Sequence, residues 1–369
     1  MAREMKVAIV CDWLTNVGGA EKVLLEIHRL YPKAPIYTSK YSKWGINWFS
    51  DADVRTGWLQ IFPVFMRRIL GPLRVKWFSR LDLTEYDLVI SVTGAEAKCV
   101  SRLKPGAKHI SYCHAPTQYY WQLYDTYIKN PGFGIFNPFV RFFFKLLVKP
   151  MRKADFEAAS RVDEFVTISE YTRGLIAKYY KREATVIHPP VEVDKFKYKE
   201  FEIGNYYVVT SRQVNWKRLD LAVKACMKLK RELVVIGEGP EHSRLVKMAS
   251  NCEFVKFLPL MGREELAAYL GGARGYIFPS MEPFGIAPVE ALAAGCPVIA
   301  YGAGGALDYI KDGKNGILFE KQTIDALAVA ILEFEKKKFD RVKISESVRE
   351  FSVSRFDREI KEFVDEKVL

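Results

Sequence analysis

The segment Glu282-Pro-Phe-Gly-Ile-Ala-Pro-Val-Glu290 places two carboxylates eight positions apart, on either side of a glycine-bearing turn. A strand-like run, Gly275-Tyr-Ile-Phe-Pro279, precedes it, and an apolar run closed by glycine, Ala291-Leu-Ala-Ala-Gly295, follows it. This order predicts a strand, a turn and a helix whose N-terminus is open to an anion, because the first N–H groups of a helix have no partners inside it. Glu282 and Glu290 would bracket a bound phosphate with groups that accept hydrogen bonds from hydroxyls, which suits a sugar nucleotide. The alternative is an ordinary turn with two solvated acids.

The bulk properties of the chain narrow the classes of protein to consider. A length of 369 residues predicts two domains, and a net charge of +12 admits nucleic acid, an anionic membrane or a polyanionic substrate as partner. The six cysteines are scattered, which argues against a disulfide framework or structural zinc and fits a reducing compartment. The N-terminal segment does not have the pattern of a signal peptide, and no apolar run reaches membrane-spanning length. We therefore expect a cytoplasmic protein, soluble or peripheral on the inner face of the membrane.

Apolar runs that alternate with helical patterns predict two doubly wound α/β sheets. The predicted strands of the first half are Met5–Val10, Ile36–Thr38, Leu88–Val92, His109–Tyr112 and Glu164–Ile168, and those of the second half are Tyr206–Thr210, Leu233–Ile236, Cys252–Val255, Gly275–Phe278 and Pro297–Ala300. The predicted helices of the second half are Leu219–Lys230, Pro240–Ala249, Glu264–Leu270 and Val289–Ala294. The proline-rich stretch Val186–Asp194 predicts a hinge or linker. We expect two Rossmann-like domains, residues 1–190 and 200–351, whose carboxyl strand edges face each other across a cleft.

Three further segments carry candidate chemistry. Gly18-Gly19, between the first strand and its helix, would let the backbone approach a diphosphate, or has a purely structural role in the turn. Arg212 and Lys217, in the loop after the strand Tyr206–Thr210, could neutralise the charge on a departing nucleotide diphosphate, or form a solvated basic turn. His114 ends a strand of the first domain, where a lone histidine is usually a satisfied core imidazole.

The motif E-x7-E followed by Ala291-Leu-Ala-x-Gly-x-Pro-Val-Ile-Ala300 resembles the donor-site signature of the retaining glycosyltransferases of family four, which have the GT-B fold. Arg212 and Lys217 match the R-x4-K element of that family, although Arg218 stands where many relatives carry glycine. The stretch Asp308–Gly316 resembles another family motif, with Asp308 where glutamate is usual. The resemblance covers nearly the whole chain.

The resemblance implies a role for each matched residue. It makes Glu282 an acceptor of hydrogen bonds from hydroxyls of the donor sugar. It implies that Glu290 binds the ribose and that His114 lies beside the transferred sugar. It assigns stabilisation of the leaving diphosphate to Arg212 and Lys217. Further contacts with the donor are implied for Gly18, Gly19, Glu238 and the backbone amides of Phe284, Gly285 and Ile286. The C-terminal helix, residues 352–369, would pack back on the first domain.

The reaction that the resemblance implies is hexose transfer with retention, in which the acceptor hydroxyl attacks beside the leaving phosphate and no covalent nucleophile is needed. Three segments, Cys11–Leu14, Tyr112–Pro116 and Ile187–Val191, are similar to the mannosyltransferase-like subgroup of surface polysaccharide biosynthesis. This subgroup implies mannose from GDP-mannose and a lipid-linked or oligosaccharide acceptor. Two other functions stay open: a basic nucleic-acid-binding protein, and a GT-B-like sugar-phosphate synthase.

No bound metal or cofactor is expected. Asp51-Ala-Asp53 formally matches the D-x-D motif, but nothing around it resembles a nucleotide site, and GT-B enzymes typically need no metal. At the end of the first strand, Asp12 and Trp13 belong to the acceptor side or to the core.

Two segments, 58–80 and 136–153, mix aromatic and aliphatic residues with five cations each. This composition is typical of helices that lie on an anionic membrane, and also of core helices with a basic outer edge.

Overall fold

The computed structural model describes residues 5–64, 66, 69–129, 131, 134–200 and 202–368. The chain forms two compact units, unit 1 over Met1–Pro189 with Asp357–Leu369, and unit 2 over Pro190–Phe356. The first boundary lies inside the proline-rich stretch Val186–Asp194, and the second lies inside the C-terminal helix α13 (Val353–Val368).

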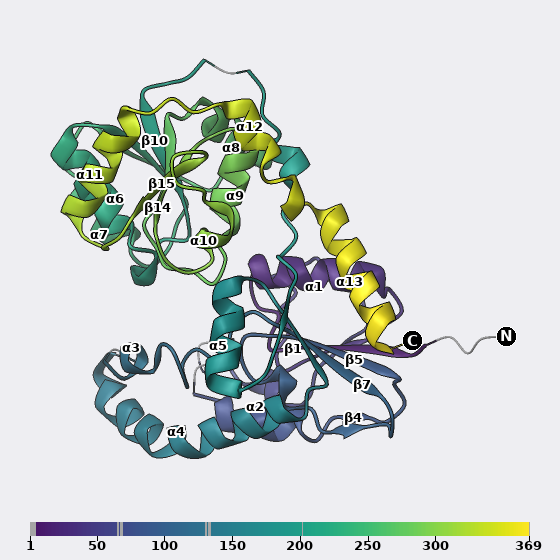
Figure 1. Cartoon of the computed structure of the whole chain (residues 1–369). Coiled ribbons are helices and arrows are strands. Elements are labelled where there is room, and N and C mark those ends of the chain that lie inside the picture. The colour runs from purple at the N-terminus through teal and green to yellow at the C-terminus, as the bar shows by residue number, and fades with distance from the viewer. Residues whose placement is uncertain are drawn as a thin grey trace. The chain divides into compact units, whose positions relative to one another are not determined.

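Unit 1 is built on a parallel sheet with the strand order β3-β2-β1-β5-β7-β8-β9 (Figure 1). Its strands are β1 (Val7–Cys11), β2 (Ile36–Thr38), β3 (Val54–Arg55), β5 (Leu88–Thr93), β7 (Lys108–Cys113), β8 (Glu164–Thr167) and β9 (Thr185–Val186), with a separate pair β4 (Asp82–Leu83) and β6 (Arg102–Leu103). Its helices are α1 (Gly19–Leu30), α2 (Gly71–Phe78), α3 (Tyr124–Lys129), α4 (Asn137–Ser160), α5 (Glu170–Tyr180) and the C-terminal part of α13.

Unit 2 is built on a second parallel sheet, ordered β12-β11-β10-β13-β14-β15. Its strands are β10 (Tyr206–Thr210), β11 (Glu232–Ile236), β12 (Val255–Leu258), β13 (Gly275–Phe278), β14 (Val298–Tyr301) and β15 (Gly316–Phe319). Its helices are α6 (Leu219–Leu229), α7 (His242–Met248), α8 (Arg263–Gly272), α9 (Ile286–Ala293), α10 (Ala306–Tyr309), α11 (Ile324–Glu335) and α12 (Arg341–Glu346).

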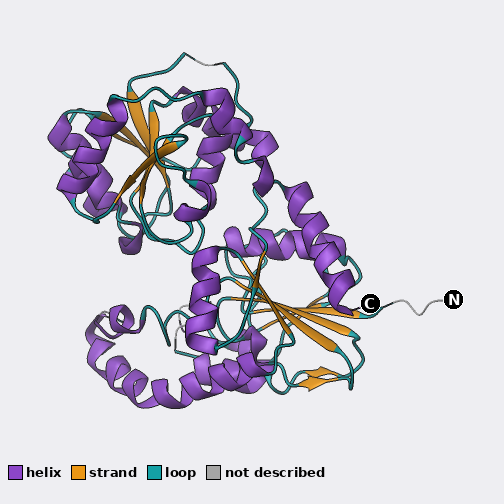
Figure 2. Ribbon diagram, viewed as in Figure 1, coloured by secondary structure: helices purple, strands orange, loops and turns teal. Residues whose placement is uncertain are grey.

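Helices cover both faces of each sheet (Figure 2). In unit 1, α1 and α13 lie on one face, and α2 lies with the C-terminal part of α4 on the other (Figure 1). In unit 2, α6 and α11 pack together on one face, and α8 and α9 lie on the opposite one. A strand covered on both faces buries every side chain, which explains why β1 is an uninterrupted apolar run, Val7-Ala-Ile-Val-Cys11, with all five residues buried.

Most predicted strands and helices lie within a few residues of their expected positions, but one strand and one helix begin elsewhere, and the edge strand β15 was not predicted. The strand expected at Cys252–Val255 begins only at Val255, because Cys252 belongs to the turn before it. Helix α9 starts three residues earlier than expected, at Ile286, so Glu290 lies inside the helix and not at its start. The sequence analysis also missed β15, whose short run Gly316-Ile-Leu-Phe319 follows a turn and completes the edge of the sheet.

The two basic aromatic segments differ in how far their helices are buried. In segment 58–80, α2 is a core helix, because Trp77 and Phe78 are buried in the core of unit 1 and Arg74 is buried beside Glu96. Its cations Arg67 and Arg68 lie outside the described residues. Segment 136–153 forms most of α4 and exposes several of its phenylalanines. Among the described residues, no helix is long and apolar enough to cross a bilayer.

A buried imidazole in unit 1 generates a prediction about pH. His109 lies in β7, fully buried, with Nε2 2.8 Å from Ser91 Oγ, and burial lowers the pKa of its imidazole to about 4. Because an unfolded chain protonates this group near its ordinary pKa of about 6.5, its contribution to stability is complete above pH 6.5 and is lost as pH falls towards 4, by about 3 kcal/mol at most.

We therefore expect His109→Gln to flatten the decline in urea-unfolding midpoint between pH 7 and pH 4.5. The comparison of the two proteins at each pH cancels the titration of all other groups. Identical slopes for parent and variant would contradict the prediction.

Candidate functional site

The residues predicted to bind the donor in unit 2 lie at the carboxyl ends of β10, β11 and β13. Strands β10 and β13 are neighbours in the sheet, although two strands, β11 and β12, and three α-helices lie between them along the chain, so the strand order reverses between them. In open α/β sheets, ligands bind at such a reversal, because the loops on its two sides diverge and leave a crevice.

An ion pair joins the loops after β10 and β13. Lys217, at the end of a short 3-10 turn, places Nζ 2.5 Å from Glu282 Oε2, and both side chains are mostly buried. Ser280, which is 2% exposed, donates from Oγ to the other carboxylate oxygen of Glu282 at 2.8 Å. The structure therefore brings together two predicted residues and adds Ser280, which the sequence analysis did not single out.

The second predicted cation is oriented differently. Arg212 is exposed, and its guanidinium has no ion-pair partner among the described residues. Arg218, which stands where many relatives carry glycine, takes a left-handed backbone conformation with φ +53°. Glycine adopts this conformation without a steric penalty, whereas other residues are disfavoured by about 1 kcal/mol, so Arg218 holds a backbone shape that favours glycine.

The conformation of the loop before α9 requires glycine at position 285. Its φ is +96°, and a Cβ at this position would lie 2.8 Å from both Phe278 Cζ and Tyr309 Oη. The ring of Phe284 is buried against Tyr309, whose hydroxyl donates to the Phe284 carbonyl at 2.9 Å. Helix α9 then begins at Ile286 without a side-chain cap, so its N-terminal partial positive charge faces the loop that carries Glu282.

Glu290 lies inside α9 and is nearly buried. Arg263, at the start of α8, places Nη1 3.5 Å from Glu290 Oε1, and its other terminal nitrogen lies 2.7 Å from Glu192. The hydroxyl of the buried Tyr276 in β13 has a raised pKa, mainly because of burial, with smaller contributions from the charges of Glu282 and Glu290. The structure thus brings both acids of the E-x7-E motif into the field of one buried tyrosine.

Two loops at this edge pack backbone against backbone. Gly237 and Gly239 have φ of +123° and +155°, and a Cβ at either would lie 2.4 Å from the carbonyl oxygen of Ser211 or Gln213, respectively. The fully buried Gln213 donates its N–H to the Glu238 carbonyl at 2.7 Å, so the loop after β10 is fixed to the loop after β11. The Glu238 side chain is left exposed.

In unit 1, Gly18 and Gly19 start helix α1 after β1. Gly18 is the N-cap of the helix, and a Cβ there would lie 2.8 Å from Glu21 Oε2. A larger residue at position 18 would displace this buried carboxylate from the first turn of the helix. The glycine at this position therefore has a local steric reason in addition to any role in binding.

His114 follows β7 in unit 1, and its backbone N–H donates to the Thr93 carbonyl at 2.8 Å. Burial lowers the pKa of its imidazole to about 4, so the ring is neutral at neutral pH. Its Nε2 is buried and has no hydrogen-bond partner in the described part of the chain.

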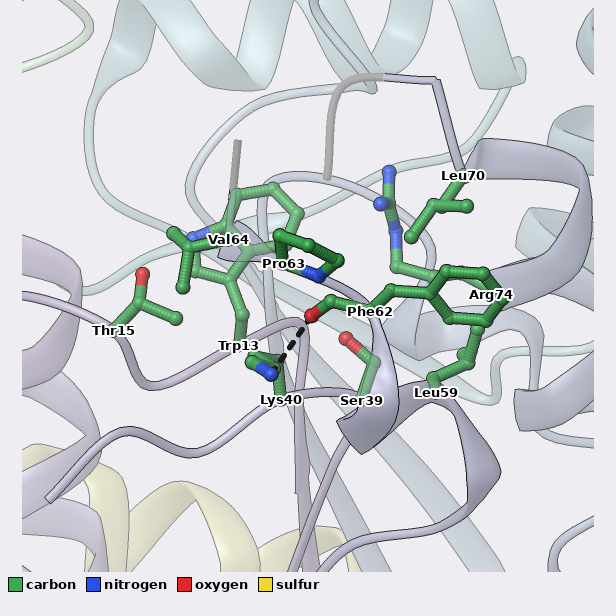
Figure 3. Close-up of a pocket in the computed structure, with 10 residues that line it drawn as sticks. All are labelled: Trp13, Thr15, Ser39, Lys40, Leu59, Phe62, Pro63, Val64, Leu70 and Arg74. Atoms are coloured by element: carbon green, nitrogen blue, oxygen red, sulfur yellow. Dashed lines mark hydrogen bonds between the residues drawn. The ribbon is translucent and has the colours of Figure 1, made fainter. Parts of the chain in front are cut away.

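Asp12 and Trp13, at the end of β1, have different surroundings. The buried carboxylate of Asp12 accepts hydrogen bonds from the amides of Gly94, Ala95 and Ala97, at 2.8–3.0 Å, so it holds the turn after β5. Trp13 lines a pocket of unit 1 (Figure 3). The pocket residues are Trp13, Thr15, Ser39, Lys40, Leu59, Phe62, Pro63, Val64, Leu70 and Arg74.

The cations of this pocket are already bonded to the protein. Lys40 donates to the Phe62 carbonyl at 2.8 Å, and the Arg74 guanidinium lies 5.2 Å from the centre of the Trp13 ring and pairs with Glu96 (Figure 3). Within the described residues, no group of three His, Cys, Asp or Glu side chains is placed to hold a metal ion.

The comparisons with known proteins agree with this architecture. Residues 190–351 match the family model for glycosyl transferases, group 1. A GDP-mannose-dependent alpha-(1-6)-phosphatidylinositol monomannoside mannosyltransferase of Mycolicibacterium smegmatis is 30% identical over 198 residues, which cover 46% of this chain and 52% of that protein. An uncharacterized glycosyltransferase of Methanocaldococcus jannaschii is 27% identical over 198 residues, 53% of this chain and 56% of that protein. The chain therefore spans about half the length of the curated relatives it matches.

Solved structures match over the whole chain. Anabaena HepE in complex with UDP superposes with a TM-score of 0.71 at 19% identity. The match covers 98% of this chain and 100% of the HepE chain. The lipopolysaccharide outer core galactosyltransferase WaaB matches with the same TM-score and coverage at 15% identity. The fold of this chain is therefore the GT-B fold of these solved structures. The match of unit 2 to the group 1 glycosyl transferases, and the likeness to mannosyltransferases over about half of the chain, support a glycosyltransferase of the GT4 type.

The tight fit around Gly285 yields a prediction about stability. We expect Gly285→Ala to lower the free energy of unfolding by about 2 kcal/mol or more, because it adds backbone strain and pushes the rings of Phe278 and Tyr309. Gly174→Ala, inside α5 with open space around its Cα, should instead stabilise by about 0.5–1 kcal/mol. Denaturant unfolding measures both, and equal effects of the same sign would contradict the steric argument.

Proposed function

We propose that this chain is a retaining hexosyltransferase that takes a hexose from a nucleotide sugar, with GDP-mannose as donor. The observation that carries the proposal is the pairing of Lys217 with Glu282 at the strand-order reversal, in front of the uncapped start of α9. This arrangement offers a cation and backbone N–H groups to a diphosphate and a carboxylate to sugar hydroxyls.

In the proposed mechanism, the donor diphosphate attracts Lys217 away from Glu282 when it binds. The carboxylate then accepts hydrogen bonds from hydroxyls of the sugar, while Ser280 continues to hold its second oxygen. Lys217 and the exposed Arg212 stabilise the negative charge that builds on the diphosphate as the glycosidic bond breaks. Glu290 holds the ribose, and the amides of Phe284, Gly285 and Ile286 with Glu238 complete the donor contacts of unit 2.

Retention follows if the acceptor hydroxyl attacks on the face that the diphosphate leaves, with a phosphate oxygen taking its proton. No side chain then acts as a covalent nucleophile. For unit 1 we propose that the neutral imidazole of His114 donates a hydrogen bond to a hydroxyl of the transferred sugar, and that Gly18 and Gly19 approach the donor phosphate. Positioning and charge stabilisation supply the catalysis, without a bound metal.

The relatives named as GDP-mannose-dependent mannosyltransferases support GDP-mannose, whereas HepE was solved with UDP and UDP-glucose. A thermal-shift screen of GDP-mannose, UDP-glucose and ADP-glucose tests the choice, because a ligand that binds only the folded state raises the melting temperature. We expect the largest shift with GDP-mannose. A larger shift with UDP-glucose would overturn the choice of GDP as the nucleotide, but not the proposal that unit 2 binds a nucleotide sugar. The acceptor is proposed as lipid-linked or an oligosaccharide.

Substitution of the two members of the ion pair, Lys217 and Glu282, should affect GDP binding differently. We expect Lys217→Ala to lower kcat for donor turnover by roughly 100-fold or more, and to weaken binding of both GDP and GDP-mannose, since it removes a diphosphate contact. Glu282→Ala should cause a similar loss of turnover but leave GDP binding intact, because its partner is the sugar. Lys224→Ala, an exposed lysine on α6, is the matched control and should change neither quantity. Parent-like turnover in both site variants would refute the assignment.

Ser280 should act as a positioning residue for Glu282. We expect Ser280→Ala to lower kcat/KM for the donor roughly tenfold, the order of one hydrogen bond to a charged group. The shift in melting temperature caused by GDP should not change, and Ser280→Thr should restore part of the activity. A parallel loss of GDP binding would mean that Ser280 only supports the fold of the loop.

A further inference from the structure

Helix α4 exposes an apolar face that none of the described residues of unit 1 covers. Phe139, Phe142 and Leu146 are 66%, 64% and 63% exposed, although each is large and apolar. Because they lie three and four positions apart, their side chains share one face of the helix. The exposed apolar side chains of this face are Phe136, Phe139, Phe142, Phe143, Leu146 and Leu147. Single exposed apolar residues are ordinary, but a contiguous group of this size indicates an interaction surface.

The opposite side of α4 is firmly attached to unit 1. Phe144 stacks on Tyr124 with ring centroids 5.8 Å apart, and Val148 is buried. Near the middle of the helix, Arg152 donates to the Tyr120 carbonyl at 2.6 Å and lies over the ring of Trp121. Helix α4 is therefore packed against unit 1 on one side, and only its opposite side is exposed.

The charges along α4 separate into two groups. Residues 137–153 contain five cations and no acid. Arg141 and Arg152 are used inside the unit, since Arg141 donates to the Ile128 carbonyl at 2.9 Å. Lys145, Lys149 and Lys153 follow each other at intervals of four, all exposed, and form one row along the helix. Lys145 and Lys149 have no ion-pair partner among the described residues, and Lys153 has only Glu157, 3.9 Å away.

We propose that the exposed face of α4 docks on the surface of a membrane that contains anionic phospholipid. The phenyl rings and leucines would enter the boundary between headgroups and acyl chains, and the row of three lysines would bind lipid phosphates. The exposed rings pack on each other, with Phe139 and Phe143 centroids 4.6 Å apart, which leaves them poorly placed to stack on single nucleic acid bases. A symmetric pair of these faces would bring two rows of lysine together, so charge favours an anionic partner over a second copy.

Co-sedimentation of the whole chain with large unilamellar vesicles tests the proposal, with vesicles of 70% phosphatidylcholine and 30% phosphatidylglycerol compared with pure phosphatidylcholine. We expect binding to the mixed vesicles that falls as salt is added. Lys145→Gln with Lys149→Gln should reduce the partition coefficient roughly 30-fold at low salt, and Phe139→Ser with Leu146→Ser should reduce it at least tenfold. All four side chains point to solvent, so circular dichroism and melting temperature should match the parent.

The matched controls lie in unit 2. Lys224→Gln with Lys256→Gln removes the same charge from exposed positions, and Leu260→Ser removes a leucine that is 74% exposed. Both should bind vesicles like the parent. The proposal is overturned if the parent does not bind, if it binds neutral vesicles equally well, or if the controls lose as much binding as the α4 variants. It is also overturned if sedimentation velocity shows a dimer that the α4 variants abolish while vesicle binding is absent, since the face would then bind a second copy.

Discussion

The donor half of this protein depends on how closely its loops approach one another at the carboxyl edge of the unit 2 sheet. Gly237 and Gly239 allow the loop after β11 to touch the backbone of the loop after β10, and Gly305 donates to the Glu282 carbonyl at 2.9 Å from the loop after β14. A Cβ at Gly305 would lie 2.4 Å from the Pro283 carbonyl oxygen, so no other residue fits there without movement. This packing brings Lys217 within reach of Glu282. Their ion pair is thus a consequence of backbone contacts and not the force that assembles the loops.

The same packing fixes the charged side chains of the proposed donor site. Each acid of the E-x7-E motif has a charged partner: Glu282 pairs with Lys217, and Glu290 pairs with Arg263. Glu282 is held from both sides, by Lys217 and by Ser280. The mechanism proposed above relies on charges that are held in place before the diphosphate departs. Unit 1 shows a parallel use of a buried acid, Asp12, which holds the turn after β5 through three amides and is itself enclosed.

Much of the fold could be predicted because its signals are local. Continuous apolar runs such as Val7–Cys11 and Tyr206–Thr210 can be satisfied only by strands covered on both faces, and their alternation with helices leaves few topologies. The strand Gly316–Phe319 was missed because it is short and lies at the edge of the sheet, where periodicity carries little information. Ser280 and Gln213 were missed for a different reason. Ser280 contacts one side chain, that of Glu282, and Gln213 contacts the loop that carries Glu238. Neither the residue type nor the spacing in the sequence predicts such contacts.

The amino-acid sequence by itself determined the alternating strands and helices and the positions of Glu282, Glu290, Arg212 and Lys217 in loops that follow strands, because apolar periodicity and motif spacing are properties of the linear chain. Only the tertiary structure decided which partner each charge has: Lys217 pairs with Glu282, Arg212 stays exposed, and Arg74 of the first basic segment is buried. It also separated two segments of similar composition into a core helix, α2, and a helix with an exposed apolar face, α4. Composition could not separate them, since burial depends on what the rest of the chain packs against each face.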